Sequence, residues 1–170
     1  MSKLKALLLT QGMHGMFSQV EGLAKALNLN YKHQEIKLKK FWNFIPPSLT
    51  PASMSVLETQ FIFDSKVIIS CGRKSVIPSI ALKKKYKEKV FTIHIQDPKV
   101  STNLFNFIIL PEHDNDLQGQ SVIRSKGALH YITETEIINS QDRNKKIDVG
   151  LLLGAQKKKI IRIYKEEKLR

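Results

Sequence analysis

Two glycine-containing turns in this sequence each follow an apolar run of strand length and precede helix-like sequence. The first turn holds Gly12 and Gly15, and Gln19 follows it. Backbone N–H groups at such a turn point toward a phosphate or another anion when a helix starts there. The turn lacks the third glycine of a dinucleotide fingerprint and the Gly-Lys-Ser/Thr of a P-loop. A ligand-binding loop and a structural tight turn are therefore equal alternatives.

The second turn combines two cations with a hydroxyl group. It contains Gly72, Arg73, Lys74 and Ser75. The positive end of a helix dipole adds to the attraction of such cations for an anion. A solvated basic loop explains the same residues, so this turn also has two interpretations.

Amide, acid and imidazole side chains follow two later apolar runs. They are Gln96 and Asp97 after one run, and Glu112 and His113 after the other. A general acid/base site needs groups of these types, but loops also use them as backbone caps. The His, Asp and Glu residues do not stand at a diagnostic metal-ligand spacing. We therefore expect neither a metal nor a cofactor.

Three further reactive side chains are assigned structural roles. Cys71 is the only cysteine, has no recognisable base partner and is interpreted as a small buried hydrophobe. His94 lies inside an apolar run, which favours a hydrogen-bonded core histidine. His130 is interpreted as structural as well.

Apolar runs that do not alternate with polar residues predict strands buried on both faces. Such runs span residues 4–10, 67–70, 90–95 and 107–110. Helical crossovers between them predict a mostly parallel, doubly wound, Rossmann-like α/β sheet. Ligands of such sheets bind at the carboxyl ends of strands, so we expect the loops after these runs to converge along one edge. Those loops contain Gly12, Gly72, Gln96 and Glu112.

The remaining strands and the longest loop are less strongly marked. Further strands are predicted at residues 34–38 and 121–124. Residues 41–51 contain three prolines and cannot form a regular helix. We expect a loop there that carries exposed aromatic side chains.

Two helices are predicted from apolar spacing and capping signals. The first spans residues 18–28, where Ser18 and Glu21 have capping-box spacing. The second spans residues 77–86 and places Pro78 in its first turn, where proline is tolerated.

Composition limits the class of protein and its partners. A chain of 170 residues fits one domain, and the net charge of +13 attracts phosphate, anionic lipid or acidic partners. Much of the excess lies in lysine runs typical of solvated surface, and no RNA-binding motif accompanies it, so nucleic acid is not an expected partner. Without a membrane-spanning run or an export signal, we expect a cytoplasmic protein.

Five sequence blocks together resemble the alphaproteobacterial members of the plant mitochondrial-fission protein family named for elongated mitochondria. The blocks are Gly12-x-x-Gly15 with Gln19, Cys71-Gly72-Arg73-Lys74-Ser75, Ile95-Gln96-Asp97-Pro98, Pro111-Glu112-His113-Asp114 and Gly127-Ala128-Leu129-His130. Their order and spacing match over about residues 4–154. The resemblance implies the N-terminal half of a two-domain architecture similar to the GT-B glycosyltransferases. Such bacterial proteins are often labelled nucleoside-diphosphate-sugar epimerases.

The sequence departs from the family pattern in two places. An acid and a histidine usually stand in the first loop where this chain has Gln11 and Met16, which weakens the implied chemistry. Residues 149–154 resemble the first strand of the family's second domain, and only Lys-rich sequence follows. We therefore expect a Rossmann-like domain at residues 1–143, and a linker with a strand remnant at residues 144–170.

These features lead to one hypothesis and two alternatives. The leading hypothesis is a truncated half that binds a sugar-phosphate or nucleotide-sugar ligand or acceptor and is not catalytic alone. The first alternative is a glycosyltransferase-like or epimerase enzyme completed by a separately encoded C-terminal half. The second is a basic module in peripheral contact with a membrane surface. For residues 149–153 we expect pairing with another chain or disorder, and deletion of residues 147–170 should barely change thermal unfolding.

Overall fold

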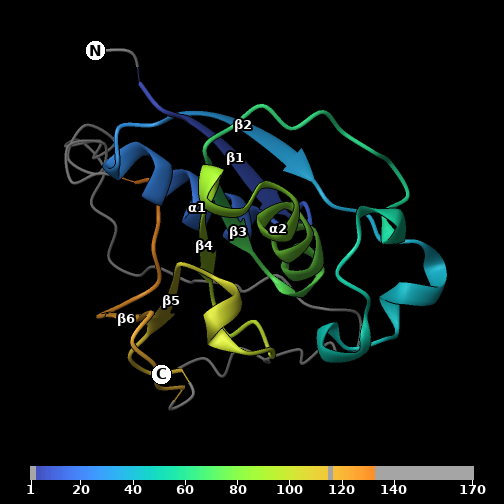
Figure 1. Ribbon diagram of the computed structural model, residues 1–170. Coiled ribbons are helices and arrows are strands. Elements are labelled where there is room, and N and C mark those ends of the chain that lie inside the picture. The colour runs from blue at the N-terminus through green and yellow to red at the C-terminus, as the bar shows by residue number, and fades with distance from the viewer. Residues whose placement is uncertain (1–2, 115–116, 133–170) are drawn as a thin grey trace, which may run out of the picture. The chain divides into compact units, whose positions relative to one another are not determined.

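The computed structural model describes residues 3–114 and 117–132, which form one six-stranded sheet with helices on both faces (Figure 1). The strand order is β2-β1-β3-β4-β5-β6, and every neighbouring pair is parallel. This confirms the predicted doubly wound, Rossmann-like α/β fold. The strands and α-helices are β1 Lys5–Thr10, α1 His14–Ala26, β2 Asn30–Glu35, β3 Val67–Cys71, α2 Arg73–Tyr86, β4 Phe91–Ile95, β5 Phe107–Pro111 and β6 Val122–Ser125. Short 3-10 turns are η1 Lys40–Asn43, η2 Pro47–Leu49, η3 Met54–Val56, η4 Lys87–Lys89 and η5 Thr102–Leu104.

The central strands form because both of their faces can be buried. All five residues of β3 are buried, and β1 is buried from its second residue onward. On one face, Leu8 and Ile69 pack with Val20 of α1. On the other face, Leu7 and Ile68 pack with residues of α2. The four strands predicted from unbroken apolar runs are confirmed as the adjacent central strands of the sheet.

The second strand lies earlier in the chain than its sequence predicted. Residues 34–38 were expected to form it, whereas β2 spans Asn30–Glu35. β2 is an edge strand whose residues are exposed or half-buried, so it carries no apolar run. The apolar residues Ile36 and Leu38 instead follow β2 and pack into the core on the α2 face.

Both helices begin earlier than predicted. α1 starts at His14 instead of Ser18, because Met13 is its N-cap and the Met13 carbonyl accepts from the Met16 and Phe17 N–H groups. Ser18 therefore lies inside the helix, and the predicted capping box is wrong. Glu21 accepts a hydrogen bond from the Tyr31 hydroxyl at 2.8 Å instead.

α2 starts at Arg73 instead of Ile77, so Pro78 lies inside the helix and not in its first turn. Gly72 has a φ of +88° and reverses the chain directly after β3, which lets helical hydrogen bonding begin at once. Because Pro78 has no N–H group, it cannot donate the usual helical hydrogen bond to the Lys74 carbonyl one turn before it. The prediction was misled by the usual position of proline in helices.

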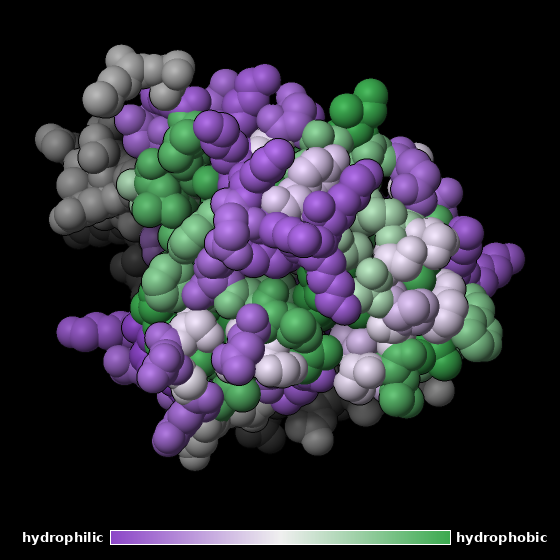
Figure 2. Space-filling model, viewed as in Figure 1, coloured by the Kyte–Doolittle hydropathy of each residue, from purple (hydrophilic) through white to green (hydrophobic). Residues whose placement is uncertain are grey.

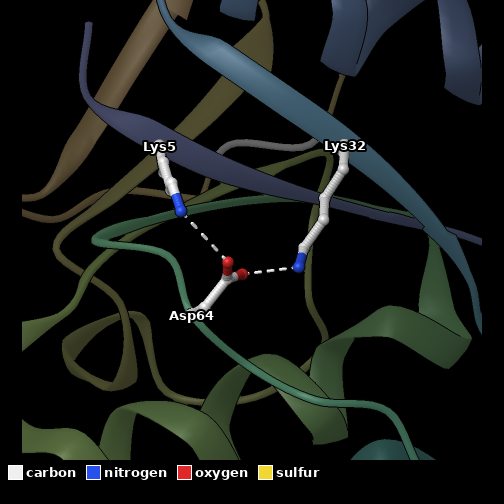
Figure 3. A network of polar contacts seen from close by, with 3 residues as sticks. All are labelled: Lys5, Lys32 and Asp64. Carbon is white, nitrogen blue, oxygen red and sulfur yellow. Dashed lines mark hydrogen bonds and ion pairs between the residues drawn. The ribbon is translucent and has the colours of Figure 1, made fainter. Parts of the chain in front are cut away.

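The long connection between β2 and β3 contains three 3-10 turns. Its residues 41–51 form no regular α-helix, as their three prolines predicted. At its end, Asp64 binds Lys5 of β1 at 3.3 Å and Lys32 of β2 at 2.5 Å (Figure 3). Hydrogen bonds from Lys32 and then Lys5 hold the pKa of Asp64 below its usual value. This contact fastens the connection at the amino ends of the strands, opposite the edge where ligands are expected.

Several predictions fall outside the described residues. They are the domain boundary near residue 144, the strand at residues 149–153 and the behaviour of the tail, and each stays a prediction. In the part of the chain that is described, no helix is both long and apolar enough to cross a membrane.

Candidate functional site

The strand order places the four predicted loops on one edge of the sheet. β1, β3, β4 and β5 are consecutive parallel neighbours, so their carboxyl ends lie side by side. Neighbouring strands are about 4.8 Å apart, so the loops after β1 and β5 are separated by about 14 Å along this edge. The order 2-1-3-4-5 has its topological switch point between β1 and β3, which is where ligands of such sheets bind. We call this region the carboxyl edge.

The loops after β1 and β3 contact each other at the switch point. A Cβ atom added to Gly72 would lie 2.4 Å from Gln11 Nε2 and 2.6 Å from Met16 Cε. Gly72 therefore cannot carry a side chain, because of both its positive φ and its cover by Gln11 and Met16. These two side chains replace the usual acid and histidine of the resemblance, and here they pack against the β3 loop.

The N-termini of both helices lie next to this contact without a side-chain cap. Within the described residues, neither α1 nor α2 has a capping hydrogen bond or an acidic residue in its first turn. Gly12 and Gly15 are exposed, and a Cβ at Gly15 would find no atom within 4 Å. The positive ends of two helices therefore lie in adjacent loops at the switch point. This arrangement favours the binding of an anion there.

The cations and hydroxyl of the second turn have different roles in the structure. Arg73 donates to the Ile45 carbonyl at 2.7 Å, which holds the β2–β3 connection against α2. Ser75 is buried and donates to the Gly72 carbonyl at 2.7 Å, so its hydroxyl is engaged within the turn and leaves the helix N–H groups uncapped. Lys74 is half-buried and has no hydrogen-bond or ion-pair partner among the residues described. Lys74 therefore keeps all of its donors for a ligand, whereas the exposed Arg73 keeps its charge but uses one donor on Ile45.

Gln19 and Cys71 join α1 to β3 and do not form a nucleophilic site. The Cys71 thiol donates a weak hydrogen bond to Gln19 Oε1 at 3.9 Å. Cys71 is fully buried, and burial raises the pKa of its thiol to about 12. A thiolate is therefore not populated near neutral pH, and the structural interpretation of Cys71 is confirmed.

The loop after β4 is stabilised by hydrogen bonds to the Asp97 side chain within the loop. Asp97 accepts from the Lys99 N–H at 2.9 Å and from Lys99 Nζ at 2.6 Å, so the capping alternative describes it well. Gln96 has a φ of +83°, and its N–H donates to the Ile109 carbonyl of β5 at 2.9 Å. Its side chain is half-buried, and the residue follows β4 on the carboxyl edge, one strand beyond the switch point.

Glu112 and His113 lie at the far end of the same edge. Both side chains are exposed, and the Glu112 N–H donates to the Ser125 carbonyl at 2.8 Å. Two strands, β3 and β4, separate β5 from β1. These residues share an edge with Gly12, but they are not part of the contact at the switch point. No metal-binding group of three His, Cys, Asp or Glu side chains occurs among the described residues.

Sequence reasoning missed Glu35, which ends β2 beside the first loop. A Cβ atom at Gly12 would lie 2.9 Å from the carboxyl carbon of Glu35, and Thr10 is paired with Glu35 in the sheet. Lys37 Nζ lies 3.8 Å from Glu35 Oε1. Glu35 follows Gly12 by 23 residues, close to the separation at which Rossmann folds place a ribose-binding acid. The misplaced β2 prediction concealed this signal.

Two comparisons relate the chain to known proteins. A family model described as "Mitochondrial fission ELM1" matches residues 14–160. The chain is similar to the "Mitochondrial fission protein ELM1" of Arabidopsis thaliana, with 33% identity over 48 residues. That match covers 28% of this chain and 11% of the Arabidopsis protein. No solved structure matches the chain.

Proposed function

This chain belongs to the mitochondrial fission ELM1 family, and we propose that it serves there as one Rossmann-like half of a GT-B-like architecture that binds a sugar phosphate or nucleotide sugar. The ligand lies at the carboxyl edge, over the loops after β1 and β3. The proposed role of this half is binding.

The observation that carries this proposal is the pair of uncapped helix N-termini at the switch point. Each N-terminus leaves backbone N–H groups without an intrahelical acceptor, and a phosphate supplies several acceptors at once. Lys74, in the first turn of α2, adds a full positive charge. The ligand's phosphate group is therefore assigned to the first turns of α1 and α2.

Glu35 supports a ligand that also carries hydroxyl groups. Its carboxylate lies against Gly12 and is an acceptor only, so it repels a bare phosphate and accepts from a sugar hydroxyl. A sugar phosphate or the ribose of a nucleotide sugar satisfies Glu35 and the helix ends together. Inorganic phosphate satisfies the helix ends alone.

The proposal is tested by following backbone amide signals of the full chain in an NMR titration. The probes are glucose 1-phosphate, UDP-glucose and inorganic phosphate, each added to about 10 mM, well above the Kd expected for a weak site. We expect saturable shifts at Gly12, Gly15 and Gly72. Lys74→Ala should weaken binding by about tenfold or more, because it removes a charge-assisted hydrogen bond.

Two variants make the outcome specific. Lys85→Ala removes a lysine from the other end of α2 and should leave the Kd unchanged. Glu35→Gln should weaken binding of glucose 1-phosphate and leave inorganic phosphate unaffected or better bound. The proposal fails if none of the probes shifts the three glycine signals, or if Lys74→Ala and Lys85→Ala have equal effects.

A further inference from the structure

The connection between β2 and β3 exposes three large apolar side chains within nine residues. The exposed fractions are 66% for Phe41, 84% for Phe44 and 74% for Leu49. In Figure 2, green and pale side chains gather on the right, where Figure 1 draws this connection. Single exposed apolar residues are common on proteins, but a group of them marks a surface that binds something.

Contacts with the rest of the domain hold the backbone of this segment in place. The exposure of its apolar side chains is therefore a property of the folded structure. Trp42 packs against the core cluster on the α2 face. The Asn43 side-chain amide donates to the Leu38 carbonyl at 3.1 Å. The Trp42 ring also contacts the Phe41 ring, with 4.9 Å between the ring centres, so one side of Phe41 is held in place while the residue stays 66% exposed.

Two further hydrogen bonds fix the second half of the segment. Arg73 of α2 donates to the Ile45 carbonyl at 2.7 Å, and the Thr50 hydroxyl donates to the Pro46 carbonyl at 3.0 Å. Pro47 is buried beneath them. Leu49, one turn later, has no such cover and stays exposed.

The geometry of η1 places the two phenylalanines on one side. Side chains at i and i+3 of a 3-10 helix are eclipsed, and the Phe44 N–H donates to the Phe41 carbonyl at 3.4 Å. Phe41 and Phe44 therefore project from the same face of this turn. Together they form one continuous apolar surface, here called the ridge.

Within residues 36–57 every charged side chain is positive. Lys37, Lys39 and Lys40 are exposed, whereas Ile36 and Leu38 between them are buried. Residues 36–57 contain no aspartate or glutamate. An aromatic ridge bordered by lysines matches the boundary between the acyl chains and the anionic headgroups of a bilayer.

We propose that residues 37–49, here called the aromatic segment, dock this protein on the surface of an anionic lipid bilayer. Phe41, Phe44 and Leu49 enter the interfacial layer, and Lys39 and Lys40 bind headgroup phosphates, whereas Lys37 Nζ lies 3.8 Å from Glu35 Oε1. A protein partner is the less suitable occupant, because lysine is depleted from protein interfaces. This surface is distinct from the ligand site at the switch point, although Arg73 connects the two.

Vesicle binding of the full chain tests this directly. Phosphatidylcholine vesicles with and without about 30 mol% phosphatidylglycerol are compared, since the anionic lipid sets the surface potential. Trp42 is the only tryptophan, so its fluorescence reports on this segment alone. We expect binding only to the anionic vesicles, weaker at about 0.5 M salt than at about 0.1 M. Lipids brominated near the headgroup should quench Trp42.

Paired variants separate insertion from simple charge attraction. Phe41→Ser with Phe44→Ser keeps every charge and should weaken partitioning by about tenfold or more. Ile62→Ser, at an apolar side chain that is 86% exposed outside the segment, should have no effect. Lys39→Glu with Lys40→Glu should abolish binding, whereas Lys85→Glu with Lys89→Glu, which makes the same charge change elsewhere, should reduce it only slightly.

Three results would overturn the proposal. Vesicle binding that is equal for the wild type and the double serine variant would show attraction by net charge alone. Equal losses in the two lysine pairs would show the same. Failure of the wild type to bind anionic vesicles, with Trp42 shielded instead by self-association or a protein partner, would assign the ridge to a protein interface. Far-ultraviolet circular dichroism of each variant verifies that it is folded.

Discussion

His94 illustrates how one polar side chain is accommodated in the core of this sheet. It is fully buried in β4, and its Nδ1 lies 2.8 Å from Ser70 Oγ in the neighbouring strand. The Ser70 hydroxyl also lies 3.3 Å from the Ile93 carbonyl, to which it donates. The hydroxyl oxygen then accepts from Nδ1–H, and the imidazole is neutral. The sequence-based interpretation of His94 as a hydrogen-bonded core histidine is confirmed.

Burial lowers the pKa of His94 to about 3, from an ordinary value of 6.5. Below pH 6.5 the unfolded chain therefore takes up a proton at His94 that the folded chain does not accept until about pH 3. The unfolded state binds more protons in this window, so stability decreases as the pH falls. From about pH 7 to pH 5 the His94 contribution is a loss of about 2 kcal/mol.

His94→Asn provides the matching measurement, because its side chain retains a group near the Nδ1 position without titrating. Urea unfolding of both proteins at pH 7 and pH 5 should show a smaller decrease for the variant, by about 2 kcal/mol. Burial also lowers the pKa of His33. Its contribution cancels when the variant's change in unfolding free energy is subtracted from that of the wild type. Parallel pH profiles would mean that His94 is hydrated or charged in the folded state.

At the scale of elements, Gly22 lies in the interior of α1, although glycine has a low helix propensity. Gly22 costs about 1 kcal/mol relative to alanine there. The reason lies in residues 127–132, which cross α1 at this point. A Cβ at Gly22 would lie 2.3 Å from the His130 carbonyl oxygen. Lys25 Nζ lies 5.0 Å from the centre of the Tyr131 ring in the same contact.

Gly22→Ala should therefore destabilise the protein, even though alanine is the better helix former. The backbone of His130 must move away, and we expect a net loss of about 1–2 kcal/mol. Thermal unfolding measures the loss, and hydrogen exchange should accelerate in residues 127–132. Gly15→Ala is the control in the same helix, with no atom within 4 Å of the new Cβ. It should be neutral or stabilising by up to about 1 kcal/mol. A stabilising Gly22→Ala would show that residues 127–132 do not pack on α1 in solution.

The sequence predicted those elements that are buried on both faces and misplaced those defined by other interactions. β3 has five buried residues and stood out as an apolar run. β2, an edge strand made almost entirely of polar residues, gave no such pattern. The start of α2 depends on the positive φ of Gly72, which sequence spacing does not record. Helix lengths were therefore underestimated at the N-terminus in both cases.

The candidate site was predictable as an edge but not as a set of contacts. Parallel strands necessarily bring the loops of Gly12 and Gly72 to one side. Whether a given side chain there is accessible depends on tertiary contacts that have no local signature. Arg73 bonds to Ile45, 28 positions earlier in the chain, so one of its donors holds the β2–β3 connection, which its motif did not indicate. Glu35 was overlooked because it is adjacent to Gly12 only through the pairing of β1 and β2.

For the whole molecule, the dominant electrostatic feature is the excess of positive charge. The chain has 28 lysines and arginines and 15 aspartates and glutamates, which gives a net charge of +13. Few carboxylates are available to balance these cations. For example, Lys5 and Lys32 share the single carboxylate of Asp64. The compact state brings the remaining cations closer together than the unfolded chain does, so self-repulsion opposes folding.

Sodium chloride should therefore stabilise this protein. Raising its concentration from about 0.02 M to about 0.3 M shortens the Debye length from about 20 Å to about 6 Å and screens most of the repulsion between exposed lysines. We expect an increase in Tm of a few °C, since about 1 kcal/mol corresponds to about 2–4 °C in a chain of this size. Lys85→Glu with Lys89→Glu lowers the net charge by four, so it should raise the Tm at low salt and reduce the gain from added salt. Effects of salt on apolar hydration are common to both proteins, so the difference between their salt responses isolates the repulsion. Identical salt responses, or a wild-type Tm that falls with salt, would show that ion pairs contribute more than self-repulsion to the stability of the folded chain.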